Sequence, residues 1–366
     1  MSTDERSGFC HLSSVICHLV RREARLIVEA LLDNFWVVLL GKVLIVAGLI
    51  PVAGLAVGFA ELKLSAKMQN RIGPYFAGGR WGWAQLLADG IKFFQKEDLI
   101  PEDADEPVFK FAPALVLLGT VALFVVVPFG PGLIVQDLDI GIFYALAISS
   151  ISTIGVLMAG WSSANKYSLI GGLRAAGQLI AYELPLVLAT VGVVVMAGTM
   201  SLDGIVQAQA GWFSETGWTG GMPFVIPQLI GFVIFFIAAL AELTRTPFDM
   251  PIAESELVMG YLTEYSGFRF LFFFLAEFAN MFTLSAIAAT LFLGGYWAPF
   301  IPDDVLMWAG PIILISKVAV LVFVIIWFRW TFPRFREDQL QTLAWKFLIP
   351  LALANIIGTA ILKVMI

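Results

Sequence analysis

The sequence predicts an all-α protein, a multi-pass transmembrane bundle of about eight spanning helices. Its 366 residues are 59% hydrophobic and only 14% charged, which is more apolar surface than a soluble protein of this size can bury. The hydrophobic residues fall into segments of roughly 17–27 residues, about the length that a helix needs to cross a ~30 Å hydrocarbon core. Open strands would leave backbone groups unpaired in lipid, so these segments are expected to be helices.

The expected spans follow one another from the first third of the chain to its end. They cover approximately residues 36–60, 109–129, 140–161, 179–200, 224–243, 268–294, 308–328 and 347–364. Residues 34–366 therefore form a single membrane domain. Residues 1–33 are an N-terminal extension to which the sequence assigns no role. Its Cys and His residues have neither zinc nor haem spacing, so no metal site is predicted.

The linkers between the spans differ in charge and in complexity. Nearly all basic residues lie in the first, third, fifth and seventh linkers, which places these linkers in the cytoplasm and both termini outside. Arg21, Arg22, Arg25 and Lys363 disagree with this rule, which leaves the location of the N-terminal tail open. The long first linker includes residues 81–95, where apolar side chains share one helical face. Such amphipathic linker helices lie along a membrane surface or cap a cavity.

Six carboxylates occur between residues 241 and 280, among long apolar runs: Glu242, Asp249, Glu254, Glu256, Glu264 and Glu277. Acids at membrane depth are costly to keep ionised and are candidates for proton or ion relays. Helix capping explains Asp249 and at most one glutamate. Burial raises the pKa of a carboxylate, so acids spaced through a wet interior titrate near neutral pH and pass protons.

Other charged residues extend this polar pattern. Arg174, Gln178 and Glu183 fall near one face of the fourth span, although a simple pair of Glu183 with Arg174 or Lys166 is an alternative. Lys42 and Lys317 lie inside the first and seventh spans. Unpaired, each buried charge would cost several kcal/mol, so we interpret the cations and acids as one internal network.

The remaining features limit the chemistry of the chain. Arg71, in a Gly-Pro turn after the first span, is either a lipid-phosphate anchor or a polar gate at the mouth of a cavity. The formal charge of −6 argues against nucleic acid as a partner. No nucleophile–base pair, phosphate loop or metal motif is recognisable. Any electron chemistry must therefore belong to a partner.

Several long motifs occur together in one order. They are residues 69–74, 88–97, 164–171, 241–249, 254–257 and 331–339. With these motifs the chain resembles the H subunits of NADH–quinone oxidoreductase, respiratory complex I, from about residue 36 to the C-terminus. The resemblance implies a membrane subunit with quinone as the substrate and with flavin and iron–sulfur clusters in partner subunits. It implies partners in both the hydrophilic and the membrane arm, and location in the bacterial inner membrane.

The resemblance also implies roles for particular residues. Those expected to border the quinone chamber are Arg71, Asp89, Lys92, Arg174, Arg245 and Asp249. Those expected on the acidic proton path are Glu61, Glu183, Glu242, Glu254, Glu256, Glu264 and Glu277.

The chain departs from the pattern of many relatives at two positions. Ile252 stands where many have an acid, and Leu62 where some have arginine. The acidic path of this chain is therefore expected to have fewer charged residues than the path of those relatives. Two alternatives stay open at this point: a membrane subunit of an energy-converting hydrogenase or related redox pump, and a solute transporter. A transporter would show inverted repeats, and none is apparent.

Overall fold

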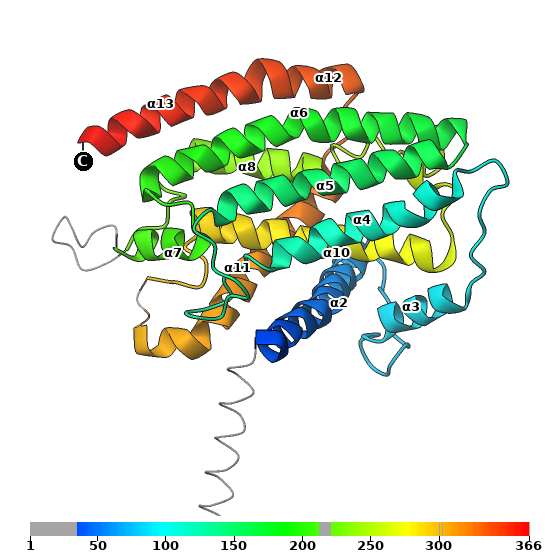
Figure 1. The fold of residues 1–366 in the computed structure, drawn as a ribbon, viewed down its shortest axis with the longest axis horizontal. Coiled ribbons are helices and arrows are strands. Elements are labelled where there is room, and N and C mark those ends of the chain that lie inside the picture. The colour runs from blue at the N-terminus through cyan, green and yellow to red at the C-terminus, as the bar shows by residue number, and fades with distance from the viewer. Residues whose placement is uncertain (1–34, 212–220, 300, 302, 366) are drawn as a thin grey trace, which may run out of the picture. The chain divides into compact units, whose positions relative to one another are not determined.

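The computed structural model describes residues 35–211, 221–299, 301 and 303–365, so the N-terminal extension 1–33 lies outside the described residues. The chain divides into two units, Met1–Leu49 and Ile50–Ile366. The second unit contains residues 50–68 of the first described helix and every element that follows it. The arrangement given below is that of the second unit (Figure 1).

The structure confirms the all-α fold class, with no β-strand among the residues described. The helices are α2 (Phe35–Met68), α3 (Gln85–Gln95), α4 (Glu106–Phe124), α5 (Gly141–Ser162), α6 (Lys166–Ala197), α7 (Leu202–Gly211), α8 (Leu229–Glu242), α9 (Glu254–Leu257), η1 (Gly260–Leu262), α10 (Gly267–Phe292), α11 (Asp303–Thr331), α12 (Glu337–Thr342), η2 (Leu343–Leu348) and α13 (Ile349–Met365).

In the described part of the chain, seven helices are long and apolar enough to cross a membrane. The fifth of the eight expected spans, residues 224–243, contains α8, which has only 14 residues. At 1.5 Å per residue α8 is about 21 Å long, short of a ~30 Å core. Pro227 explains the late start, because proline lacks an N–H and disfavours helix in the residue before it.

The amphipathic helix of the first linker is α3, which begins at Gln85 rather than at residue 81. Trp81 and Gly82 have φ angles of 88° and 66°, which a right-handed helix does not accept. A Cβ on Gly82 would lie 2.3 Å from the Pro74 carbonyl oxygen. The tight turn through residues 74–82 therefore delays the helix.

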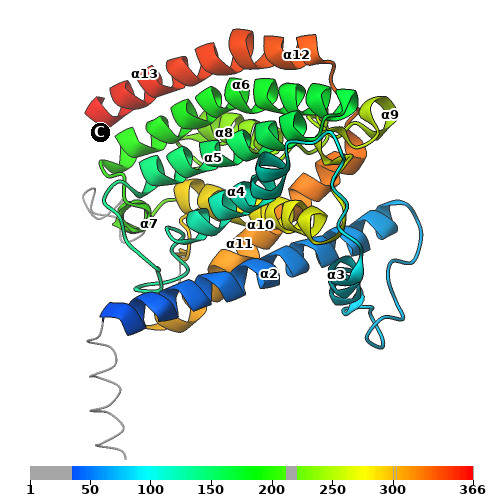
Figure 2. The ribbon, with the colours of Figure 1, turned by 45° about the vertical axis from the view of Figure 1, so that its right-hand side comes forward.

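The long helices of the second unit pack side by side. Helix α5 contacts α4 and α6, and α6 in turn contacts α8 and α13 (Figures 1 and 2). Where α5 crosses α6, a Cβ on Gly160 would lie 2.8 Å from the Cα of Gly172. Small residues at such crossings let helix backbones approach closely, as is common in membranes.

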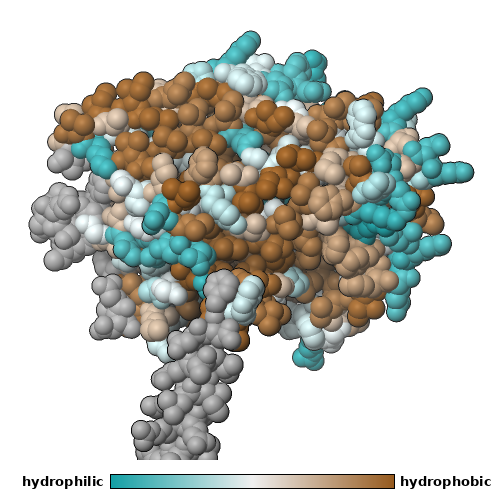
Figure 3. All heavy atoms as spheres, viewed as in Figure 1, coloured by the Kyte–Doolittle hydropathy of each residue, from teal (hydrophilic) through white to brown (hydrophobic). Residues whose placement is uncertain are grey.

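The outer surface of these helices is strongly apolar. Figure 3 shows hydrophobic residues over much of the face formed by α13, α6, α5 and α4, with hydrophilic residues gathered mainly at one edge. Ile312 on α11 and Ile357 on α13 expose 70% and 63% of their surface. In water such a surface would promote association, so the chain is a multi-pass membrane protein.

Gly171 of α6 provides a test of this packing. A Cβ at Gly171 would lie 2.6 Å from the Cα of Gly260 and 2.8 Å from the Tyr261 nitrogen. We expect Gly171→Ala to push η1 from α6 and destabilise the fold by about 1–3 kcal/mol, seen as a lower melting temperature in detergent. Gly177→Ala, on the same helix with its nearest neighbour at 3.9 Å, is the control. Equal melting temperatures for the two variants would contradict this contact.

Candidate functional site

A buried ion cluster joins three segments that are far apart in sequence. Nη1 of Arg245, in the loop after α8, donates to the two carboxylate oxygens of Glu61 on α2 at 2.8 and 3.0 Å. Nη2 of Arg245 lies 2.9 Å from Oε1 of Glu277 on α10, outside hydrogen-bonding geometry. Glu61 and Arg245 are 6% and 5% exposed. We call Glu61, Arg245, Glu277 and the cation described next the buried cluster.

Arg329, at the end of α11, completes the buried cluster and donates to Oε1 of Glu61. Glu61 is therefore held between two guanidinium groups. The Arg329 side chain is 40% exposed, so Arg245 is the buried partner of this carboxylate, and removing Arg245 would leave the Glu61 charge without a buried cation. Arg329 was not among the predicted site residues. Its only sequence signal is its position directly after the apolar run 308–328.

The loop that carries Arg245 is positioned by backbone and side-chain contacts. Helix α8 ends at Glu242, and Thr244 has a φ angle of 50°, which turns the chain. Nε2 of Gln178 donates to the carbonyls of Ala241 and Phe248, both at 2.8 Å. The Arg245 guanidinium then lies 5.1 Å from the centre of the Phe278 ring, a favourable cation–π distance.

Asp249 lies at the edge of the buried cluster. Its carboxylate is 3.4 Å from Nη2 of Arg334. Burial raises the pKa of Asp249 to about 6, and Glu277 adds to this rise, while Arg334 and Arg245 oppose it. Asp249 therefore shares the electrostatic field of the cluster and titrates closer to neutral pH than an ordinary aspartate.

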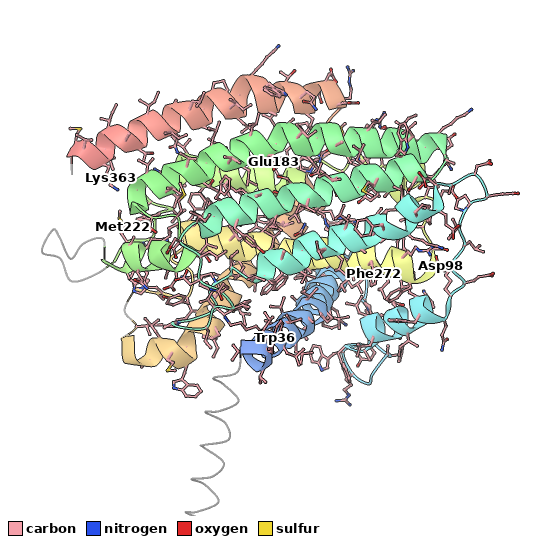
Figure 4. All side chains as sticks on the ribbon, in the orientation of Figure 1. Trp36, Asp98, Glu183, Met222, Phe272 and Lys363 are labelled. Atoms are coloured by element: carbon pink, nitrogen blue, oxygen red, sulfur yellow. The ribbon has the colours of Figure 1, made fainter. Side chains whose placement is uncertain are left out.

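Two further acids, apart from the buried cluster, lie close to each other. Glu242 of α8 and Glu183 of α6 are close enough to repel each other electrostatically. Ser150 of α5 donates to Glu183, and Ser149 lies within hydrogen-bonding reach of Glu242. Figure 4 shows Glu183 about midway along α6. We call Glu183 and Glu242 the acid pair.

Glu242 borders a small internal cavity. The cavity has about 20 Å³ of water-accessible space, enough for about one water molecule. Apart from Glu242, its polar lining residues are Ser149 and Thr190, and Leu284 of α10 is among the apolar ones. Glu242 therefore has room for a water molecule beside it.

An open cleft lies beside Arg334, the ion partner of Asp249. It encloses about 510 Å³ and is lined by Arg174, Met250, Glu256, Arg334, Phe335, Arg336, Glu337, Asp338 and Gln341. Arg174 donates to Glu256 at 2.8 Å, and this hydrogen bond lowers the pKa of Glu256. Arg334 connects the cleft to Asp249.

The other predicted site residues take part in separate local contacts. Glu264 accepts a hydrogen bond from Nδ2 of Asn165 at 2.5 Å. Arg71 donates to Gln69 at 2.7 Å in the first linker, and Asp89 lies 3.9 Å from Lys92 on α3. The side chain of Glu254 lies outside the described part of the structure.

The predicted intramembrane Lys317 binds backbone groups. Nζ of Lys317 donates to the carbonyls of Leu293, Gly295 and Trp297 at 2.6, 2.8 and 2.5 Å. These carbonyls follow the C-terminus of α10, where a cation is favourable. The partners found for Lys317 are thus backbone groups rather than the acids of the hypothesised network. Lys42 lies in the first unit, and its role stays a prediction.

Sequence reasoning missed several partners of the acids. They are Arg329, Arg334, Ser149, Ser150 and Asn165. A run of serines and a threonine at residues 149–153, inside an apolar span, was an available signal for two of them. No group of three or more His, Cys, Asp and Glu side chains in the described ranges is arranged to hold a metal ion.

This fold and site define a multi-pass membrane protein with buried, charge-compensated acids. The sequence model of the NADH dehydrogenase family matches residues 41–360. The chain is 45% identical over 324 residues to the NADH-quinone oxidoreductase H subunit of Anaeromyxobacter dehalogenans, covering 84% of this chain and 77% of the relative. It is 49% identical over 309 residues to the corresponding protein of Bacillus mycoides, covering 83% and 87%. The chain belongs to the family of NADH-quinone oxidoreductase H subunits.

The raised pKa of Asp249 predicts a specific pH dependence. Its value of about 6 lies above the ordinary 3.8, so between these values the folded state keeps a proton that the unfolded state has released. The contribution of Asp249 to stability therefore falls as pH rises through this window. We expect an infrared carboxylic-acid band that disappears with a midpoint near pH 6 and is missing in Asp249→Asn. A midpoint near 4 would contradict the burial of this group.

Ile252 provides a second test, because its side chain could face either a polar path or an apolar cluster, and the structure shows the apolar cluster. The side chain packs against the apolar cluster that includes Phe109, Tyr261 and Phe273. We therefore expect Ile252→Glu to reduce the amount of assembled complex, since a carboxylate there loses hydration without gaining a partner. Ile252→Leu should assemble normally. Normal assembly of Ile252→Glu, measured on native gels, would show that the position faces a polar path instead.

Proposed function

We propose that this chain forms the membrane floor of the quinone chamber of a proton-pumping NADH–quinone oxidoreductase and carries an acidic path that couples quinone reduction to proton translocation. The observation that carries this proposal is the buried cluster, in which Glu61 and Glu277 share Arg245 and Asp249 lies beside them. The family to which the chain belongs supports this reading over the hydrogenase and transporter alternatives.

The position of the cleft fits the floor of a chamber. Arg174, Arg334 and Arg336 line it and supply hydrogen-bond donors for polar groups of a partner or for the carbonyl oxygens of a quinone. Arg334 also contacts Asp249, which brings the buried cluster within one side chain of the cleft. Arg71, Asp89 and Lys92, on the exposed first linker, would line the entrance for a quinone arriving from the lipid.

Proton movement would follow the acids inward. Reduction of a quinone to a quinol consumes protons, and the raised pKa of Asp249 suits it to give and take a proton near neutral pH. Glu277 interacts electrostatically with Asp249. A change of charge at Asp249 would therefore be felt electrostatically at Glu277, and the path would continue to Glu183 and Glu242. Glu254, Glu256 and Glu264 would lie on the cytoplasmic part of this path.

The partners and location follow from the same reading. Flavin and iron–sulfur clusters would belong to hydrophilic-arm subunits that cover the cleft, and membrane-arm subunits would receive the protons. This orientation counts residues 224–243, which contain the short α8, as one of eight crossings. The basic odd-numbered linkers would then face the cytoplasm of a bacterial inner membrane, with the termini on the other side.

Replacement of Glu242 tests the path. We expect Glu242→Gln to assemble but to lower quinone-dependent NADH oxidation and proton pumping by roughly 100-fold, because an amide cannot relay protons. NADH oxidation by an artificial acceptor at the flavin should stay normal. Glu106→Gln, which removes an exposed partner of Lys110, is the control and should keep full activity. Normal coupled turnover of Glu242→Gln would overturn the proton-path assignment.

A further inference from the structure

The two groups of acids are separated along α10. Glu277 belongs to the buried cluster, whereas Leu284, seven residues later, lines the cavity beside Glu242. Seven residues of helix span about 10 Å. A proton passes between groups only through hydrogen-bonding contacts of about 3 Å. A path from the buried cluster to the acid pair therefore needs something polar in this interval.

Asn280 lies in this interval on α10. It follows Glu277 by three residues and precedes Leu284 by four, and side chains at these spacings share one helix face. Its Oδ1 atom is buried and has no hydrogen-bond partner. The face of α10 between the two groups of acids thus carries a buried acceptor that no protein group satisfies.

Gln178 of α6 carries a second buried amide, between the segments that lead to Glu242 and Asp249. It is 1% exposed, and its Nε2 binds the carbonyls of Ala241 and Phe248, which directly precede Glu242 and Asp249 in the chain. Its Oε1 atom is buried and has no partner. The amide therefore lies between the segment that carries Glu242 and the segment that carries Asp249.

Buried glutamines elsewhere in the fold have both ends satisfied. Gln209 donates to the Thr290 carbonyl at 2.9 Å and accepts from the Phe224 nitrogen at 3.1 Å. Gln228 donates to Thr359 at 2.5 Å and accepts from Asn355 at 2.8 Å. An unsatisfied buried acceptor costs about 1–3 kcal/mol, and native proteins commonly satisfy it with ordered water.

We infer that Gln178 Oε1 and Asn280 Oδ1 each hold a water molecule, and that these waters connect the buried cluster with the acid pair. Each water would donate one hydrogen to an amide oxygen and direct its other hydrogen toward the path. Protons then move by exchange of O–H bonds along the waters, and the amides are not titrated. Gln178 and Asn280 are thus positioning residues, and their role rests on the proposed proton path.

The test uses the whole complex in proteoliposomes and compares two changes at one site. Asn280→Leu removes the oxygen, and Asn280→Thr keeps one without adding a charge. We expect Asn280→Leu to slow quinone-linked proton pumping by roughly tenfold or more and to enlarge the difference in turnover between H₂O and D₂O. Asn280→Thr should retain most of the rate. NADH oxidation by an artificial acceptor should be normal in both.

A control separates this role from simple loss of packing. Gln209→Leu removes a buried glutamine whose bonds are all within the protein, so it should lower the melting temperature and leave the isotope effect unchanged. If Asn280→Leu does not assemble, the smaller Asn280→Val is measured with the same expectation.

Two outcomes distinguish the failure of this inference from failure of the proposed function. If Glu242→Gln loses pumping while the apolar Asn280 variant pumps at the wild-type rate with an unchanged isotope effect, the water link is overturned and the acid path stands. If Glu242→Gln also pumps normally, both are overturned.

Discussion

The buried Glu61 carboxylate must be neutralised by cations, and the arrangement of α2, the loop after α8 and the end of α11 depends on this requirement. A lone carboxylate at 6% exposure would be costly to keep ionised. Arg245 and Arg329 compensate it, and they come from the loop after α8 and the end of α11. The requirement to bring two cations to one acid therefore ties α2, α8 and α11 together. Because Arg245 also faces Glu277, the charge state of one acid affects the other.

The two ends of the second unit satisfy their polar groups in different ways. Near the C-terminus, Lys363 donates to the Val195 and Met196 carbonyls that end α6, and Lys317 does the same after α10. These lysines complete helix ends with direct bonds and hold them in place. Toward the buried cluster, by contrast, Gln178 and Arg245 keep unsatisfied buried atoms. Buried hydrogen-bonding atoms without a protein partner suit a region where water and protons move. Helix ends whose carbonyls are all bound by a lysine suit a region that stays fixed.

The sequence predicted the elements well because each depends on local composition. Apolar runs located the spans, and the failures have local causes, such as Pro227 before α8 and the positive φ of Trp81 before α3. Partners of the site residues were not predictable in the same way. Arg329 and Glu61 are 268 residues apart, and nothing in either segment specifies the other. Lys317 showed the same limit, since its position inside a span gave no sign that helix-end carbonyls would bind it.

The apolar environment of Ile252 is consistent with a path that uses few charges. Its side chain packs against the cluster containing Phe109 and Tyr261, so this position adds an apolar contact rather than an acid. A further acid near Asp249 would raise the pKa of Asp249 further and demand another buried cation. Neutral amides such as Gln178 orient water without adding charge. A chain with one acid fewer can therefore still connect its acids, provided that amides hold water in the interval between them.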